Sequence, residues 1–367
     1  MPELPEVNRA KNLVNTFAGK VIEKVETVED TIVFAGTTHD EFAKELTGRT
    51  VESAGRYGKV FYINLSGSGK MPVLHFGMTG MLQVRGELAT YYKETPKTAS
   101  TDWPPRFMKF ILHLVDESGA TTELAFLDAR RLGRIRLCES PLTEPPISEL
   151  GFDPILSMPG FEEYKRLVLK RSCPIKALLL DQSFSAGVGN WVADEILYNA
   201  RIHPETRSNA LTDQQLIALH QQTSNVCETA VSVDADDSKF PENWLFKHRW
   251  GKGKKAAHTL KLPSGEPATI KWITVGGRTS AYVVELQTLD GPVKKLTRGK
   301  RKPKEKEGDE SDLSALTDSD DDRAPPISKP KSTGTPKVQK KRRKTVHVEP
   351  EPSTSNKTVR STRARIP

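Results

Sequence analysis

The sequence predicts an α+β protein: an N-terminal helix and an antiparallel β-sandwich, followed by a helical region, a β-hairpin and a charged tail. Short β-rich runs separated by glycine-bearing turns fill residues 21–140, which is typical of a sandwich or barrel. Apolar residues at helical spacing dominate residues 141–238. After about residue 298 apolar side chains become scarce, and Lys, Glu, Asp, Ser and Pro prevail. That composition is typical of disordered chains.

The first element is a helix that starts near Pro5, which suits a first turn, and stops before Gly19, which suits a C-cap. Four apolar residues between Pro5 and Gly19 have the spacing of a single helix face: Val7, Ala10, Val14 and Phe17. Strand-like runs follow at residues 21–28, 59–65, 106–115 and 121–127. A proline-rich linker then begins, with Pro141, Pro145 and Pro146.

Helical patterns follow the linker at residues 161–170, 174–182, 190–200 and 211–231. The glycine-bearing loop SFSAGVG separates the second pattern from the third. Residues 269–287 predict two strands around a Gly276-Gly277 turn. We therefore expect four regions: a β-sandwich domain (1–140), a helical domain (141–238), a basic hairpin (239–298) and a disordered tail (299–367).

The formal charge of +8 is unevenly distributed along the 367 residues. Residues 1–238 carry 25 basic and 32 acidic side chains, residues 239–298 carry 12 and 4, and residues 299–367 carry 18 and 11. A polyanion that binds residues 1–238 would therefore contact a few individual Lys and Arg side chains, whereas residues 239–367 would attract it through their overall positive charge. The three cysteines stand far apart, and no apolar run approaches the ~18 residues of a membrane span. We expect a soluble intracellular protein that does not contact membranes.

The N-terminus reads Met1-Pro2-Glu3-Leu4-Pro5-Glu6-Val7. One interpretation is a helix start with acids near the positive end of the helix dipole. The other is chemical, because removal of Met1 would expose the secondary amine of Pro2, which is less basic than a lysine. Such an amine can attack a sugar C1′ and form an iminium, and the adjacent Glu3 can move a proton at the sugar ring oxygen.

Six motifs occur in order: PELPEV, HFGMTGMLQVR, LDARRLGRIRL, GFDPI, the run from Ile175 to Glu205, and GGRTSAYV. Through them the sequence resembles the formamidopyrimidine-DNA glycosylase and endonuclease VIII family, closer to the first branch, over about residues 2–290. The resemblance implies Pro2 as nucleophile, Glu3 as general acid/base and Glu6 as a supporting acid. It also implies that Lys59 contacts a phosphate near the lesion, whereas the pattern alone favours a solvated turn lysine.

Chemistry on a base requires the nucleotide to leave the helix, and the gap must then be filled. The resemblance places Met78, Arg130 and Leu132 at the void-filling positions, with Arg130 facing the orphaned partner base. Leu132 departs from the bacterial branch, where an aromatic residue is common. From the pattern alone, Met78 and Leu132 would be ordinary core residues.

The SFSAGVG loop leads into Asn190, the first residue of a predicted helix. Free backbone amides at a helix N-terminus form an anion site, and a plain helix cap is the alternative. In the family this loop belongs to a helix-two-turn-helix motif, in which Asn190 and Lys176 match phosphate contacts and Asp181 matches a structural acid.

No cysteine follows Cys227, so the four-cysteine zinc finger of bacterial relatives is absent, and we expect neither a metal nor another cofactor. The hairpin instead resembles the zincless finger of the plant and fungal branch. Arg278 matches a fingertip arginine that contacts phosphates around the flipped nucleotide; a simple turn arginine is the alternative.

The tail holds the basic cluster Lys340-Lys341-Arg342-Arg343-Lys344 and an acidic run at residues 317–322. The basic cluster predicts a nuclear address or a DNA tether, and a solvated linker is the alternative. The acidic run fits either phosphorylation or charge balance. We expect a nuclear monomer that binds double-stranded DNA with oxidised bases or abasic sites, with tail contacts to other repair proteins.

The resemblance implies a bifunctional DNA glycosylase and abasic-site lyase of base excision repair, which acts through a Pro2 Schiff base and β,δ-elimination. The implied substrates are oxidised purines, namely formamidopyrimidines, hydantoins and more weakly 8-oxoguanine. Two alternatives stay open: an oxidised-pyrimidine glycosylase of the endonuclease VIII type, and a non-catalytic protein that binds damaged DNA.

Overall fold

The computed structural model describes residues 2–88, 102–252 and 259–289, all within the first of the chain's two units, residues 1–320. Helix α1 (Leu4–Asn15) opens the chain, with Pro5 in its first turn. Val7, Ala10 and Val14 are buried along one face, as their spacing predicts. The predicted N-terminal helix is therefore confirmed.

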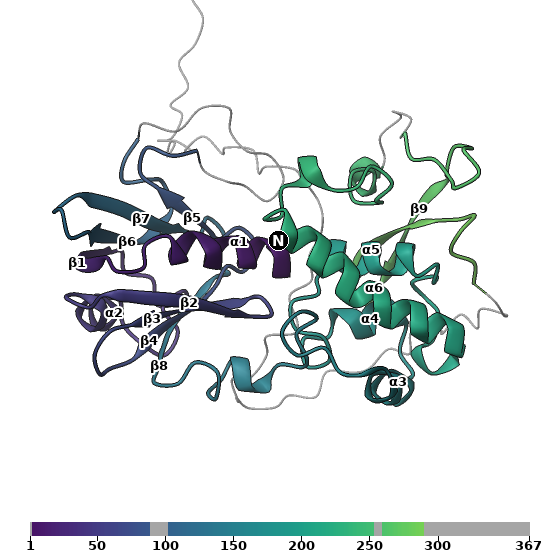
Figure 1. The fold of residues 1–367 in the computed structure, drawn as a ribbon, viewed down its shortest axis with the longest axis horizontal. Helices are drawn as coiled ribbons and strands as arrows, with labels where there is room; N and C mark the ends of the chain where they lie inside the picture. The colour runs from purple at the N-terminus through teal and green to yellow at the C-terminus, as the bar shows by residue number, and fades with distance from the viewer. Residues whose placement is uncertain (1, 89–101, 253–258, 290–367) are drawn as a thin grey trace, which may run out of the picture. The chain divides into compact units, whose positions relative to one another are not determined.

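Two four-stranded antiparallel sheets form the β-sandwich that α1 accompanies (Figure 1). The first sheet has the order β1 (Val21–Thr27), β6 (Met108–Val115), β7 (Thr121–Leu127) and β5 (Met81–Val84). The second has the order β2 (Val51–Tyr57), β3 (Val60–Leu65), β4 (Met71–His75) and β8 (Arg134–Cys138). The strands of the second sheet follow one another in chain order, whereas in the first sheet β5 lies at the edge, beyond β6 and β7.

Phenylalanine rings from both sheets meet in the core of the sandwich. Phe76, just after β4, lies 4.9 Å from Phe61 and 5.6 Å from Phe126 between ring centroids. Phe126 in turn lies 5.4 Å from Phe110, and such separations favour packed aromatic pairs. Strands β1, β3, β6 and β7 confirm the four predicted strands; buried and half-buried residues alternate along β3, whereas β6 and β7 each contain four consecutive buried residues.

Helix α2 (His39–Leu46) is an element that the apolar pattern did not predict. Only Phe42 and Leu46 of its eight residues are buried, too few to display a period. Its start carries a recognisable signal, because Thr38 Oγ1 accepts from Glu41 N at 3.1 Å while Glu41 Oε2 accepts from Thr38 N at 2.8 Å. This reciprocal pair is a capping box, and it marks the N-terminus of the helix.

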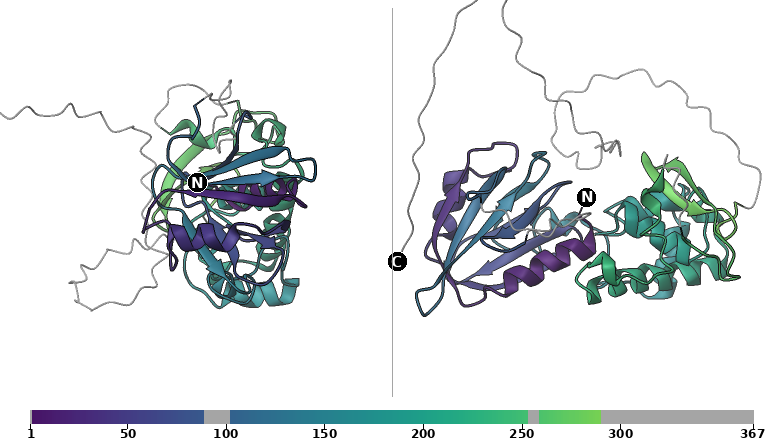
Figure 2. Two further views of the ribbon diagram at one scale, coloured as in Figure 1. Left: turned by 90° about the vertical axis from the view of Figure 1, so that its left-hand side faces the viewer. Right: turned by 90° about the horizontal axis from the view of Figure 1, so that it is seen from above.

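Four helices build the second core, in agreement with the four predicted helical patterns: α3 (Phe161–Leu169), α4 (Ile175–Leu180), α5 (Asn190–Asn199) and α6 (Asp213–Ser232). Trp191 is wholly buried there. Its ring lies 4.9 Å from that of Phe246 and 5.6 Å from that of Phe240. Figure 2 shows these helices gathered beside the strands of the hairpin.

The hairpin pairs β9 (Ile270–Val275) with β10 (Arg278–Val283) in antiparallel register. Gly276 and Gly277 take φ values of +61° and +76°, the left-handed conformation that a tight two-residue hairpin turn requires at both positions. The predicted hairpin is therefore confirmed. A third apolar cluster joins it to α5 and includes Tyr198, Leu245, Ile270, Ala281 and Val283.

Asp153, in the GFDPI motif, joins the linker to the turn between β2 and β3. Its carboxylate receives Arg56 at 2.5 and 3.2 Å, and it accepts the backbone N–H of Gly58 at 2.8 Å. The N–H groups of Ile155 and Leu156 complete the shell, each at 3.0 Å. Since both charged partners are buried, the pair fixes the turn that carries Lys59.

No helix in the part of the chain that the structure describes is long and apolar enough to cross a membrane. The basic cluster at residues 340–344 and the acidic run at residues 317–322 lie outside the described residues. Both remain predictions from the sequence.

Asp153→Asn is expected to destabilise the protein by about 3–5 kcal/mol, because it leaves the buried Arg56 charge without a counter-ion. A clear drop in the midpoint of thermal unfolding would show this. The control is Asp213→Asn, which removes an exposed acid that pairs with Lys165 at 2.7 Å and should leave the midpoint nearly unchanged. Equal effects of the two substitutions would contradict the assignment.

Candidate active site

The Glu3 carboxylate joins the start of α1 to the start of α5. Its two oxygens accept the backbone N–H groups of Trp191 at 3.0 Å and Val192 at 3.1 Å, and the side chain is 1% exposed. A helix N-terminus favours a negative charge through its unpaired N–H groups and its dipole. The chain thus supplies its own anion at the amides of α5 that the sequence had suggested for a phosphate, and this expectation is corrected.

Gly189, directly before α5, makes this approach possible. A Cβ atom at this position would lie 2.2 Å from Glu3 Cδ, far inside van der Waals contact. The backbone reinforces the junction, because Leu4 N donates to Gly187 O at 3.1 Å. Absence of a side chain at residue 189 is therefore a requirement of the site.

Pro2 and Glu6 line a cavity of about 660 Å³ beside the junction. Its walls come mainly from the apolar face of α1 and from the loop between β4 and β5, including Ala10, Leu13 and Met78. The volume lies in the range of small-molecule pockets. The residue predicted as nucleophile therefore has space next to it.

Glu6 is held against the backbone of Glu3. Its Oε2 accepts the N–H of Glu3 at 2.8 Å. Burial, followed by the charge of Glu3, raises the pKa of Glu6 to about 7. A carboxyl group in this range can both take up and release a proton at neutral pH.

Lys59 is 8% exposed and follows the β2–β3 turn. Burial lowers the pKa of its ammonium, the nearby Glu3 charge opposes that shift, and the Arg278 charge adds to it. Lys59 of the sandwich is therefore within electrostatic reach of Glu3 at the start of α1 and of Arg278 in the hairpin. The structure brings these predicted site residues together.

The loops that carry Met78 and Arg130 are fastened to each other by Asp128, which is buried. Asp128 Oδ1 accepts from Thr79 Oγ1 at 2.9 Å and from Arg130 N at 3.1 Å, and Oδ2 accepts from Gly133 N at 2.6 Å. These contacts give the two loops one fixed relative position.

Gly77 brings the two loops into backbone contact. It has φ of +60°, and a Cβ there would lie 2.3 Å from the carbonyl carbon of Leu132. Met78 and Leu132 are half-buried, while Arg130 is exposed. The three predicted void-filling residues thus sit on one assembled pair of loops, with the arginine reaching furthest into solvent.

Arg131 is fixed in turn by Asp30, which the sequence did not single out. Its Nε and Nη2 reach the two oxygens of Asp30 at 2.9 and 3.0 Å, and Lys109 Nζ adds a contact at 2.9 Å. Arg131 has φ of +57°, an uncommon conformation for a residue with a side chain. The ion pair with Asp30 holds Arg131 in this strained conformation and so fixes the backbone position of the preceding residue, Arg130.

Asn190 joins α5 to the hairpin next to Arg278. Asn190 Nδ2 donates to Thr279 O at 3.0 Å, directly after Arg278 in the chain. The Oδ1 atom of Asn190 is buried without a hydrogen-bond partner in the part of the chain that the structure describes. A buried oxygen without a partner is uncommon in proteins and marks Asn190 as a candidate polar contact rather than a packing residue.

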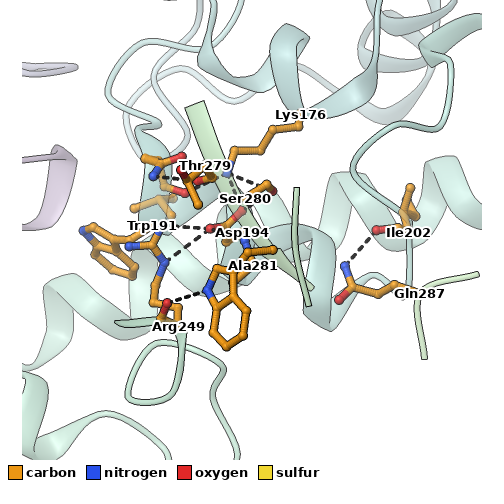
Figure 3. A network of polar contacts seen from close by, with 12 residues as sticks. Lys176, Trp191, Asp194, Ile202, Arg249, Thr279, Ser280, Ala281 and Gln287 are labelled. Atoms are coloured by element: carbon orange, nitrogen blue, oxygen red, sulfur yellow. Dashed lines mark hydrogen bonds and ion pairs between the residues drawn. The ribbon is translucent and has the colours of Figure 1, made fainter. Parts of the chain in front are cut away.

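Lys176 does not have the predicted role. Its ammonium is 0% exposed, contacts Asp194, and donates to Asn190 O at 3.1 Å and Ser280 Oγ at 3.2 Å (Figure 3). The prediction of a direct phosphate contact at Lys176 is wrong, because an ammonium with three internal partners and no exposed surface cannot reach DNA in this arrangement.

Several residues that shape the site escaped the sequence reasoning: Asp30, Asp128, Asp153, Gly189 and Asp194. Three are acids beside basic or turn segments and Asp194 is an acid inside a helix, signals that become meaningful only when their partners in the fold are known. Among the residues that the structure describes, no group of three or more His, Cys, Asp or Glu is arranged to hold a metal ion.

The chain matches two known domain families. Residues 1–135 match the formamidopyrimidine-DNA glycosylase N-terminal domain, and residues 150–242 match the formamidopyrimidine-DNA glycosylase H2TH domain. A formamidopyrimidine-DNA glycosylase from Arabidopsis thaliana is 40% identical over 315 residues, which cover 84% of this chain and 78% of the relative. One from Bacillus subtilis is 30% identical over 296 residues, covering 78% and 99%.

Solved structures share the fold. A Lactococcus lactis formamidopyrimidine-DNA glycosylase, non-covalently bound to DNA containing an abasic site, matches with a TM-score of 0.61 and 23% identity. The Lactococcus lactis protein with Fapy-dG-containing DNA matches with a TM-score of 0.62 and 22% identity. Both matches cover 78% of this chain and 100% of the other.

The pKa of Glu6, raised to about 7, makes the free energy of unfolding depend on pH. Between pH ~4.5 and 7 the unfolded chain ionises Glu6 while the folded chain keeps it protonated, so stability falls as the pH rises. Relative to Glu6→Gln, the wild type should lose up to about 3 kcal/mol across this window. Denaturant unfolding of both proteins at pH 4.5, 6 and 7.5 measures it. A pH-independent difference would refute the assignment.

Proposed function

The chain belongs to the formamidopyrimidine-DNA glycosylase family, and on this basis we propose how its residues act on DNA. It is a DNA glycosylase and abasic-site lyase of base excision repair that removes oxidised purines. The observation that carries the mechanism is the contact between the Glu3 carboxylate and the N-terminus of α5. Pro2 and Glu6 line a cavity next to this contact. The charges of Glu3 and Arg278 both affect the pKa of Lys59.

The chemistry begins with the amine of Pro2, set free by removal of Met1. The amine attacks C1′ of the damaged nucleotide, the C1′–N bond breaks, and the base leaves with a proton taken from water. Glu3, which is ionised in the free protein, takes up a proton from water and passes it to the sugar ring oxygen, so the ring opens and an iminium links Pro2 to C1′. Ionised Glu6 accepts the proton that the attacking amine releases, a role suited to its pKa of about 7.

Elimination then cuts the strand. Loss of a proton from C2′ of the iminium expels the phosphate on the 3′ side, and a second elimination expels the phosphate on the 5′ side. Water releases the remaining sugar fragment from Pro2 and restores the amine. The iminium withdraws electrons at each step, so the bond-breaking steps need only proton transfers from the residues of the junction.

DNA is held through a few placed groups. Lys59, Arg278 and Asn190 contact backbone phosphates around the everted nucleotide, which fixes position without reading sequence. Met78 and Leu132 fill the space that the nucleotide leaves, and Arg130 hydrogen-bonds the partner base. The rigid attachment of both loops to Asp128 means that little ordering is needed when they enter DNA.

The substrates we assign are formamidopyrimidines, hydantoins and abasic sites, with weaker activity on 8-oxoguanine. The relatives from Arabidopsis thaliana and Bacillus subtilis bear the name formamidopyrimidine-DNA glycosylase, which favours this class over oxidised pyrimidines. A purely DNA-binding role is disfavoured, because binding requires neither the Glu3 bridge to α5 nor a carboxyl with a pKa near neutrality beside Pro2.

We further propose that the protein acts as a monomer in the nucleus and carries a zincless finger. Support for the finger is the hairpin's own apolar cluster and its polar attachment to α5. Support for the nucleus is the basic cluster at residues 340–344, which also offers a tether to DNA or a surface for other repair proteins.

Borohydride should trap a covalent complex between wild-type protein and a duplex that contains a formamidopyrimidine or an abasic site, since it reduces the iminium. The double variant Pro2→Gly, Glu3→Gln should give less than a tenth of the trapped product, because it changes both the nucleophile and its proton donor. Glu23→Gln, an exposed carboxylate, is the matched control and should trap like wild type. Undiminished trapping by the Pro2→Gly, Glu3→Gln protein would contradict the proposed mechanism.

Single-turnover cleavage should be faster on formamidopyrimidine than on thymine glycol. Arg130→Gln should reduce the discrimination between cytosine and adenine opposite the lesion by about 10-fold or more, as expected for loss of a base contact worth ~1–3 kcal/mol. Lys24→Gln, at an exposed lysine, should leave both preferences intact. Faster cleavage of thymine glycol would instead support the endonuclease VIII type.

A further inference from the structure

We propose that Asp194 is a positioning residue for DNA binding: it fastens the hairpin to α5 so that Asn190 and Arg278 face one phosphate. The inference rests on the proposed phosphate contacts of those two residues. It assigns to a buried carboxylate the task that a metal ion performs in a zinc finger, which is to fix a small β-unit against a helix.

One carboxylate reaches three separate parts of the fold (Figure 3). Oδ1 of Asp194 contacts Lys176 of α4 and accepts from Ser280 Oγ of β10 at 2.6 Å. Oδ2 accepts from Arg249 Nη2 at 2.8 Å and Nε at 3.2 Å, and from Ala281 N at 3.2 Å. The carboxylate therefore links α4, the short turn at residues 249–251 and β10 to its own helix α5.

The network is buried and its charges are unequal. Asp194 and Lys176 are wholly buried and Arg249 is 5% exposed at the side chain. Burial alone would raise the pKa of Asp194, but the two adjacent cations outweigh it and the pKa is lowered. One buried carboxylate thus contacts two cations, one from α4 and one from the turn at residues 249–251.

The same network reaches both phosphate-contact residues. Lys176 Nζ donates to Asn190 O at 3.1 Å, and Asn190 Nδ2 donates to Thr279 O at 3.0 Å. Thr279 stands between Arg278 and Ser280 in β10. A shift of Ser280 away from Asp194 would therefore move Arg278 relative to Asn190.

Folding of the hairpin itself has other support. Ile270, Ala281 and Val283 pack with Tyr198 of α5 in an apolar cluster, and the Gly276-Gly277 turn fits a tight hairpin. Loss of the Asp194 contacts should consequently leave the strands paired but free to change their register on α5. Such a change alters where a contact group points more than whether the module folds.

The test replaces the Lys176–Asp194 pair by apolar side chains, Lys176→Met with Asp194→Leu. Net charge is unchanged, but the buried Arg249 also loses its contact with Asp194, so the midpoint of thermal unfolding should fall. The matched control is Lys165→Met with Asp213→Leu, the same substitutions at an exposed pair. Affinity for a duplex with a tetrahydrofuran abasic analogue is measured from 50 to 300 mM salt, together with thermal unfolding.

We expect the Lys176→Met, Asp194→Leu protein to stay folded, bind about 10-fold or more weakly, and show a salt slope shallower by about 1, the value of one lost phosphate contact. The single variant Arg278→Gln should show the same salt slope of DNA affinity. Adding Arg278→Gln to the Lys176→Met, Asp194→Leu protein should change the affinity little, because the effects of coupled sites are not additive. At saturating concentrations of the Lys176→Met, Asp194→Leu protein, the rate of abasic-site cleavage should stay within about 3-fold of wild type.

Wild-type affinity in the Lys176→Met, Asp194→Leu protein, or losses that add fully with Arg278→Gln, would overturn the proposal. If that protein does not fold, Ser280→Ala decides: it removes one contact of the network and should weaken binding about 3-fold, and unchanged binding refutes the role. Failure of the proposed enzyme activity would look different, because wild type itself would then neither be trapped nor cleave.

Discussion

The bond between the Glu3 carboxylate and the N-terminus of α5 is the contact on which the rest of the site depends. It ties the third residue to the backbone of residues 191 and 192, so the chain end that carries Pro2 is held by the helical region. Two N–H groups and the helix dipole stabilise the charge, which offsets the cost of burying it. Pro2 and Glu6 flank this contact in the sequence and are placed by it, whereas Lys59 is held near it by the Arg56–Asp153 pair.

Acidic residues in the first 238 positions serve the DNA-facing groups from inside. Asp128 fixes the two loops of Met78 and Arg130, Asp153 fixes the turn before Lys59, and Asp194 fixes the hairpin. This use explains how a region with 32 acidic and 25 basic side chains can still bind a polyanion. Buried carboxylates orient the contact groups, and the few exposed cations act at short range, where a positive field over the whole region is unnecessary.

The sequence predicted most elements because their apolar periods are long and regular, as in α1 and α6. It did not reveal α2, whose two buried residues are too few to show a period. For the site, the motifs predicted Pro2, Glu3 and Lys59, which the structure brings to one place. Lys176 failed because its partner Asp194 lies 18 residues further on and only the fold shows that the pair is buried. The amides of α5 failed for the same reason, since their ligand Glu3 is 188 residues away.

The junction at Glu3 also has a consequence for the order of synthesis. On the ribosome the sandwich domain emerges first, yet the amides that receive Glu3 belong to residues 191 and 192 and emerge much later. Until then α1 can pack on the sandwich, but the Glu3 carboxylate lacks the two amides that hold it. A truncated product that ends before α5 is for the same reason unable to attack DNA through a positioned Pro2. The residues around Pro2 therefore reach their final arrangement only after the helical region has been synthesised and folded.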